Sequence, residues 1–187
     1  MKTYRINEIF YSLQGEGVRA GCPSLFLRFS RCNLVCTVAS HGFDCDTDFE
    51  SGQDMASEEI VTRLQELSDQ CEWVVLTGGE PALQVDSGLI DALHAAGYKL
   101  AIETNGTREL PEGLDWITLS PKVPEDEIRV QRAHEVKYVR SLGQEIPEPV
   151  VQAEHYLISP AFDGDRLDPE TLRWCLQLVR DHPKWRI

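Results

Sequence analysis

Short apolar runs alternate with segments of helical character along most of the chain. The apolar runs cover residues 24–29, 73–77, 100–104, 116–120, 136–139 and 156–159. Helices are expected over residues 57–70, from Asp86 to a stop at Gly97, and from Asp168 to about Asp181. Strands that alternate with helices usually lie parallel in one sheet. The alternation therefore predicts an α/β fold with a largely parallel sheet.

Each predicted helix begins at a residue that suits a helix N-terminus. Ser57, Asp86 and Asp168 carry side-chain oxygens that can accept a hydrogen bond from the first turn. Pro169 fits the first helical position, where its missing N–H costs nothing.

Polar residues follow the first four predicted strands at the points where these strands end. They are Cys32, then Gly78-Gly79-Glu80, then Glu103-Thr104-Asn105, then Ser120-Pro121-Lys122. In open parallel sheets, ligands bind beyond the carboxyl ends of the strands. These residues are therefore expected to line one site.

The size and charge of the chain limit its class. Its 187 residues suit one domain, residues 1–187. The formal net charge of −13 argues against direct nucleic-acid binding. The sequence has no apolar run of membrane-spanning length and no apolar signal core near Met1, so we expect a cytoplasmic protein without membrane contact.

Three cysteines, Cys32, Cys36 and Cys45, fall within fourteen residues after the first predicted strand. Thiolates favour iron–sulfur clusters, zinc or copper(I). The C-x3-C-x8-C spacing matches neither zinc-finger nor ferredoxin patterns. Three ligands without an obvious fourth predict a metal centre with one open coordination position.

Other interpretations of these cysteines stay open on spacing alone. A structural zinc held by Cys32, Cys36, Cys45 and His41 is the main competitor. Buried, inert thiols are a further possibility, and a disulfide is less expected without signs of export. The other cysteines, Cys22, Cys71 and Cys175, lie outside the loop and are interpreted as structural.

The segment Thr77-Gly78-Gly79-Glu80-Pro81 is the second pattern with chemical content. Paired glycines after a strand let a ligand approach bare backbone, and the Glu80 carboxylate can accept from an ammonium group. A tight turn is the alternative interpretation.

With these motifs in this order, the chain resembles radical S-adenosylmethionine (SAM) enzymes, and among them the 7-carboxy-7-deazaguanine synthase family. The segments that carry the resemblance are Asn7-Glu8-Ile9-Phe10, Ser12-Leu13-Gln14-Gly15-Glu16-Gly17, Phe26-Leu27-Arg28-Phe29, Arg31-Cys32-Asn33-Leu34, Cys45-Asp46-Thr47, Thr77-Gly78-Gly79-Glu80-Pro81, Glu103-Thr104-Asn105-Gly106-Thr107 and Ser120-Pro121-Lys122. They spread over the first two-thirds of the chain. The resemblance implies a modified, incomplete (β/α) barrel that is usually a homodimer.

The resemblance also implies a set of cofactors. Cys32, Cys36 and Cys45 would hold a [4Fe-4S] cluster, and Thr47 would bind Mg²⁺ through its hydroxyl. The residues implied to contact SAM are Gly78, Gly79, Glu80, Glu103, Ser120, Pro121, Lys122 and Ser159.

A pterin, 6-carboxy-5,6,7,8-tetrahydropterin, is the implied substrate. The residues implied to bind it are Leu13, Gln14, Gly15, Glu16, Arg28 and Thr77. Glu16 would accept from the pterin N–H edge, and the planar fork of Arg28 suits the substrate carboxylate.

In the implied reaction, the reduced cluster cleaves SAM to a radical that takes a hydrogen atom from the pterin. A Mg²⁺-assisted ring contraction then releases ammonia and gives 7-carboxy-7-deazaguanine, a step of queuosine biosynthesis. An electron donor such as flavodoxin or ferredoxin would reduce the cluster, and the cofactors carry the hard chemistry.

Three features depart from the family pattern. The cysteine spacing differs from the usual C-x3-C-x2-C, and Ser159 stands where relatives carry a Leu-Gln-Pro-like strand end. The chain ends at Trp185-Arg186-Ile187, where relatives continue with a final strand and a tail. We therefore expect a domain that is shortened at its C-terminus, and a catalytically impaired relative stays an alternative.

Overall fold

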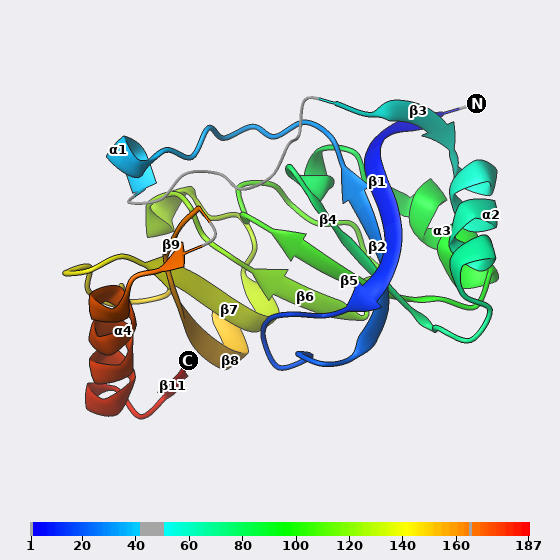
Figure 1. Ribbon diagram of the computed structural model, residues 1–187. Helices are drawn as coiled ribbons and strands as arrows, with labels where there is room; N and C mark the ends of the chain where they lie inside the picture. The colour runs from blue at the N-terminus through cyan, green and yellow to red at the C-terminus, as the bar shows by residue number, and fades with distance from the viewer. Residues whose placement is uncertain (1, 42–50, 165) are drawn as a thin grey trace.

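A computed structural model describes residues 2–41, 51–164 and 166–187 (Figure 1). Nine strands form one sheet in the order β11-β8-β7-β6-β5-β4-β2-β1-β3. These strands are β1 (Thr3–Leu13), β2 (Pro23–Phe29), β3 (Gln53–Ala56), β4 (Trp73–Gly78), β5 (Lys99–Thr104), β6 (Trp116–Leu119), β7 (Arg132–Arg140), β8 (Gln152–Pro160) and β11 (Trp185–Arg186). A separate hairpin joins β9 (Phe162–Asp163) and β10 (Arg166–Leu167).

Most neighbouring strands of the sheet run parallel, from β2 through β4, β5, β6, β7 and β8 to β11. Only β1 departs from this, because it pairs antiparallel with both β2 and β3. The sheet is open, with β3 at one edge and β11 at the other. The predicted α/β fold with an incomplete barrel is therefore confirmed.

The helices are α1 (Val38–His41), α2 (Ser57–Leu67), α3 (Ser87–Ala95) and α4 (Pro169–Asp181), with short 3₁₀ turns at Pro81–Leu83 and Glu125–Glu127. In Figure 1, α2 and α3 lie beside β1 and β2, and α4 lies beside β8. No helix in the described ranges is both long and apolar enough to cross a bilayer.

Two of the three predicted helix starts are confirmed. The Asp86 carboxylate accepts from Leu89 N at 3.0 Å, and the Asp168 carboxylate accepts from Thr171 N at 2.8 Å. The prediction for Ser57 was wrong, because Ser57 is already the first helical residue and Ala56 occupies the N-cap without a side-chain bond.

Three strands of the main sheet, β1, β3 and β11, were absent from the sequence prediction, as was the β9–β10 hairpin. β1 buries Tyr4 and Ile6, but its second half is largely exposed and its apolar pattern is weak. β3 has only four residues. β11 has only two residues and pairs with Tyr156 and Leu157 of β8, and the shortened C-terminus stays a prediction.

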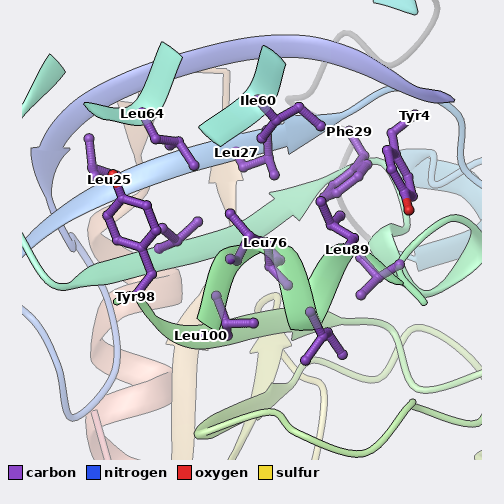
Figure 2. Packing of buried hydrophobic residues seen from close by; sticks show 14 of the residues in the cluster. Tyr4, Leu25, Leu27, Phe29, Ile60, Leu64, Leu76, Leu89, Tyr98 and Leu100 are labelled. Carbon is purple, nitrogen blue, oxygen red and sulfur yellow. The ribbon is translucent and has the colours of Figure 1, made fainter. Parts of the chain in front are cut away.

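The main hydrophobic core lies between the sheet and helices α2 and α3 (Figure 2). Leu27 and Leu76 of the strands meet Ile60, Leu64 and Leu89 of the helices, and all five side chains are fully buried. A second core joins β6, β7, β8 and α4. Because side chains alternate along a strand, the neighbours of these core residues point to the opposite face of the sheet.

Candidate active site

A row of polar residues crosses the face of the sheet that is opposite the main core. In the strand register, Arg28 pairs with Thr77, Glu103 with Thr118, and Thr118 with Glu135. The Thr77 hydroxyl donates to Glu103 Oε2 at 2.8 Å. This bond connects the pair on β2 and β4 to the three residues on β5, β6 and β7. We call these five residues the polar row. The backbone pairing of five strands thus places two carboxylates, two hydroxyls and a guanidinium on one surface.

Glu103 is the centre of this row. Its Oε1 accepts from Gln14 Nε2 at 2.8 Å, and its Oε2 accepts from Thr77. Gln14 and Thr77 were both predicted to bind substrate, whereas Glu103 was predicted to bind SAM. The structure therefore brings Glu103 together with the predicted substrate residues.

The β1–β2 loop, residues 14–22, folds back over this face. Gln14 N donates to Cys22 O at 2.8 Å, and Gly21 N donates to Gln14 O at 2.7 Å, so the two ends of the loop are joined. Val18 N donates to Glu135 Oε2 at 2.8 Å. Gln14 to Glu16 therefore lie beside the polar row, whereas Leu13, at the end of β1, is 59% exposed.

Arg28 has an environment suited to an anionic ligand. Its Nε lies 3.5 Å from Glu8 Oε2, and its guanidinium lies 5.6 Å from the centre of the Phe10 ring. The Phe10 ring stacks in turn on Phe26. Arg28 Nε is buried and has no hydrogen-bond partner within the described part of the chain. A buried donor without a hydrogen bond is costly, and a ligand carboxylate would supply one.

Cys32 and Cys36 follow β2 and are both half-buried. Leu34 N lies 3.4 Å from Cys32 Sγ and donates to it. Backbone donors of this kind are common at the sulfurs of iron–sulfur clusters. Cys45 and Thr47 lie outside the described residues, and within the described ranges no three His, Cys, Asp or Glu side chains form a metal-binding group. The two described cysteines thus suit a cluster, and the complete ligand set stays a prediction.

The glycines of the Gly78-Gly79-Glu80 segment pack against the backbone that leads to Cys32. Gly79 N donates to Phe29 O and Glu80 N donates to Arg31 O, both at 2.9 Å. A Cβ at Gly79 would lie 2.0 Å from Arg31 O, and Gly78 has a φ of 114°. These two N–H groups donate to the protein itself, so they are not available to a ligand carboxylate.

We predict that Gly79→Ala destabilises the protein, because the added methyl group collides with the backbone carbonyl of Arg31. Overpacking of this kind costs about 1–3 kcal/mol, or about 2–12 °C in Tm for a chain of this size. Thermal unfolding of the metal-free protein measures the shift. Gly15→Ala is the control, because a Cβ there meets no atom within 4 Å. Equal Tm values for the two variants would contradict the packing role.

Glu80 is almost fully buried, with 1% of its surface exposed. Its carboxylate accepts from Ala82 N at 3.0 Å, Thr104 Oγ1 at 2.7 Å and Asn105 N at 2.7 Å. Burial raises the pKa of Glu80, and these three donors oppose the rise. The side chain thereby connects the loop after β4 to the end of β5.

Asn33 connects the cysteine loop to the same strand end. Asn33 Nδ2 donates to Thr107 Oγ1 at 2.8 Å, and Asn33 Oδ1 accepts from Asn105 Nδ2 at 3.2 Å. The sequence motifs placed Asn105 at the site but indicated no role for Asn33 or Thr107. The hydrogen bonds show that three motifs, which follow β2, β4 and β5, form one connected unit.

A cleft of about 300 Å³ opens beyond the ends of β6 and β7. Two of the predicted SAM residues, Pro121 and Lys122, line it, and Lys122 Nζ donates to Ser120 Oγ at 2.8 Å. Ser159 lies on β8 in register with Val139, another residue of the cleft. The complete lining is Ser40, His41, Pro121, Lys122, Val123, Pro124, Glu125, Tyr138, Val139, Arg140 and Pro147.

Both ring nitrogens of His41 are engaged by the protein. Nε2 lies 2.8 Å from Lys122 O, and Nδ1 lies 2.7 Å from Ser40 Oγ. A zinc-bound histidine coordinates through one of these nitrogens. This arrangement therefore disfavours His41 as the fourth ligand of a structural zinc.

Comparisons with known proteins agree with this geometry. The model of the radical SAM superfamily matches residues 28–142. Two curated relatives are named 7-carboxy-7-deazaguanine synthase. The one from Bacteroides thetaiotaomicron is 44% identical over 98% of this chain and 92% of its own length, and the one from Bradyrhizobium diazoefficiens is 40% identical over 99% and 94%. The crystal structure of QueE from Escherichia coli has the same fold, with a TM-score of 0.71 at 22% identity over 98% of this chain and 92% of that one.

Proposed function

This chain belongs to the radical SAM superfamily and, within it, to the 7-carboxy-7-deazaguanine synthase family, and we propose that it converts 6-carboxy-5,6,7,8-tetrahydropterin to 7-carboxy-7-deazaguanine with release of ammonia. The observation that carries this proposal is the polar row beneath the β1–β2 loop, next to the strand end that bears Cys32. Family membership and the engaged His41 nitrogens both argue against a structural zinc protein.

Cys32, Cys36 and Cys45 would hold a [4Fe-4S] cluster, with SAM in the cleft lined by Pro121 and Lys122. When bound, the cluster and SAM supply the radical that removes a hydrogen atom from the substrate. The connected loops after β2, β4 and β5 would fix the reactants relative to one another, and the β1–β2 loop would exclude water.

The substrate chemistry matches the polar groups of the site. Arg28 offers a planar pair of donors for the pterin carboxylate. Glu103 and Glu16 offer acceptors for the N–H groups of the pterin ring, and the Gln14 amide can pair with either kind of group. The hydroxyl of Thr47 would hold a Mg²⁺ ion that also binds the substrate. A flavodoxin- or ferredoxin-like electron donor and a homodimeric state complete the proposal.

Anaerobic reconstitution followed by a two-part assay tests this function. We expect a brown protein that, with a reductant, cleaves SAM and forms 7-carboxy-7-deazaguanine and ammonia from the pterin, with faster turnover when Mg²⁺ is added. SAM cleavage without product would identify a catalytically impaired relative. A colourless, zinc-containing protein would contradict the proposal.

A further inference from the structure

Lys137 is a buried lysine in the candidate active site that no sequence motif indicated. It lies on β7, two residues after Glu135 of the polar row, so both side chains point to the same face of the sheet. Its side chain is only 14% exposed. Within the described residues, its ionic partner is Glu16 of the β1–β2 loop, which accepts a hydrogen bond from Lys137 Nζ.

The two members of this pair differ in their surroundings. The Glu16 side chain is 56% exposed, so little besides Lys137 restricts it, although Glu16 N donates to Gln14 Oε1 at 3.1 Å. Lys137 is enclosed by the sheet, and a buried ammonium is retained only when it is paired. The rigid partner therefore determines where the exposed carboxylate points.

Lys137 and Glu135 together hold the middle of the β1–β2 loop. Glu135 Oε2 accepts from Val18 N at 2.8 Å, and Lys137 binds Glu16. The start of the loop is held separately, by the bond from Gln14 to Glu103. The loop is thus attached to β7 at two points and to β5 at one.

We propose that Lys137 is a positioning residue, which holds the Glu16 carboxylate in place to accept from the N–H edge of the aminopyrimidinone ring of the substrate. This inference rests on the proposed function for the identity of the ligand. It adds a residue and a dependence on pH to that function.

The ion pair between Lys137 and Glu16 is sensitive to pH, because it depends on the charge of Lys137. Burial lowers the pKa of Lys137 to about 8. The ammonium that pairs with Glu16 is therefore present below pH 8 and is lost as the pH rises above it. The other titratable groups that share this face of the sheet are Glu135 on the same strand, His155 on β8 and Glu103 on β5.

Lys137→Met and Lys137→Arg test the proposal, with Lys99→Met as the matched control. Lys99 also pairs with a glutamate, Glu72, at 2.9 Å, but its side chain is 53% exposed. The measurements are the Kd of the pterin for the reconstituted protein without reductant at pH 7 and pH 9, SAM cleavage, and hydrogen exchange of residues 14–22 without ligand.

We expect Lys137→Met to raise the pterin Kd at pH 7 about fivefold or more and to speed hydrogen exchange of residues 14–22. The wild-type Kd should rise from pH 7 to pH 9 relative to both variants, because arginine stays charged and methionine has no charge to lose. Lys137→Arg should restore most of the affinity at pH 7, and Lys99→Met should behave as the wild type.

Unchanged affinity and exchange in Lys137→Met would overturn the proposal. A parallel loss of SAM cleavage would overturn it too, because Lys137 would then support the site as a whole. If the wild type does not bind the pterin at all, the proposed function fails instead. The exchange of residues 14–22 in the ligand-free variants still decides whether Lys137 holds the loop.

Discussion

Cys32→Ala will abolish both the iron–sulfur absorbance of the reconstituted protein and its cleavage of SAM. Cys32 stands directly beyond β2, and its sulfur accepts from Leu34 N. The predicted cluster has three protein ligands, so the loss of one leaves two, which is too few to retain a cluster with one open iron. We expect the same result for Cys36→Ala.

Iron and sulfide content, visible absorbance and 5′-deoxyadenosine formation measure the effect. Cys22→Ala is the control, because Cys22 is exposed and lies at the other end of β2. A full cluster in Cys36→Ala would show that the second ligand has been assigned wrongly.

Arg28→Lys will weaken pterin binding about ten- to a hundredfold and leave SAM binding unchanged. The guanidinium lies beside Glu8 and Phe10, and its buried Nε has no hydrogen-bond partner among the described residues. A charged hydrogen bond is worth about 1.5–3 kcal/mol, which corresponds to this range of affinity. Lysine keeps the charge but lacks the planar pair of donors.

Equilibrium binding of the two ligands, measured separately, checks this prediction. Arg5→Lys is the matched control, since the Arg5 side chain is 33% exposed, close to the 28% of Arg28, and its partner Asp54 lies 3.7 Å away on β3. Equal losses for the pterin and SAM would mean that Arg28 supports the structure of the site and does not recognise the substrate.

The alternation of apolar runs and helices was sufficient to predict the parallel part of the fold. β4 and β5 occupy the predicted positions because each carries a buried apolar run, whereas β8 was predicted only over residues 156–159 and begins earlier, at Gln152. β1 was missed because its outer half is exposed, and its place in the sheet depends on pairing with β2 and β3. Such pairing is a long-range property that a local apolar pattern does not contain.

The candidate site was predicted less completely than the fold. The motifs located the strand ends correctly, but they did not indicate which side chains meet across the sheet. Gly79 and Glu80 were predicted to contact a ligand. In the structure, Glu80 forms hydrogen bonds with Arg31, Thr104 and Asn105 of the protein itself. A signal for Lys137 was present, because a lysine inside the apolar run 136–139 requires an internal partner.

The strand register that builds the polar row also limits how the chain can change length during evolution. A deletion of one residue within β4 or β5 would turn Thr77 or Glu103 into the main core and bring a leucine or isoleucine to the polar face. A deletion in a loop leaves the alternation of every strand intact. Insertions and deletions that preserve the chemistry are therefore confined to the segments between strands, and relatives of different lengths should align without gaps across β2, β4, β5, β6 and β7.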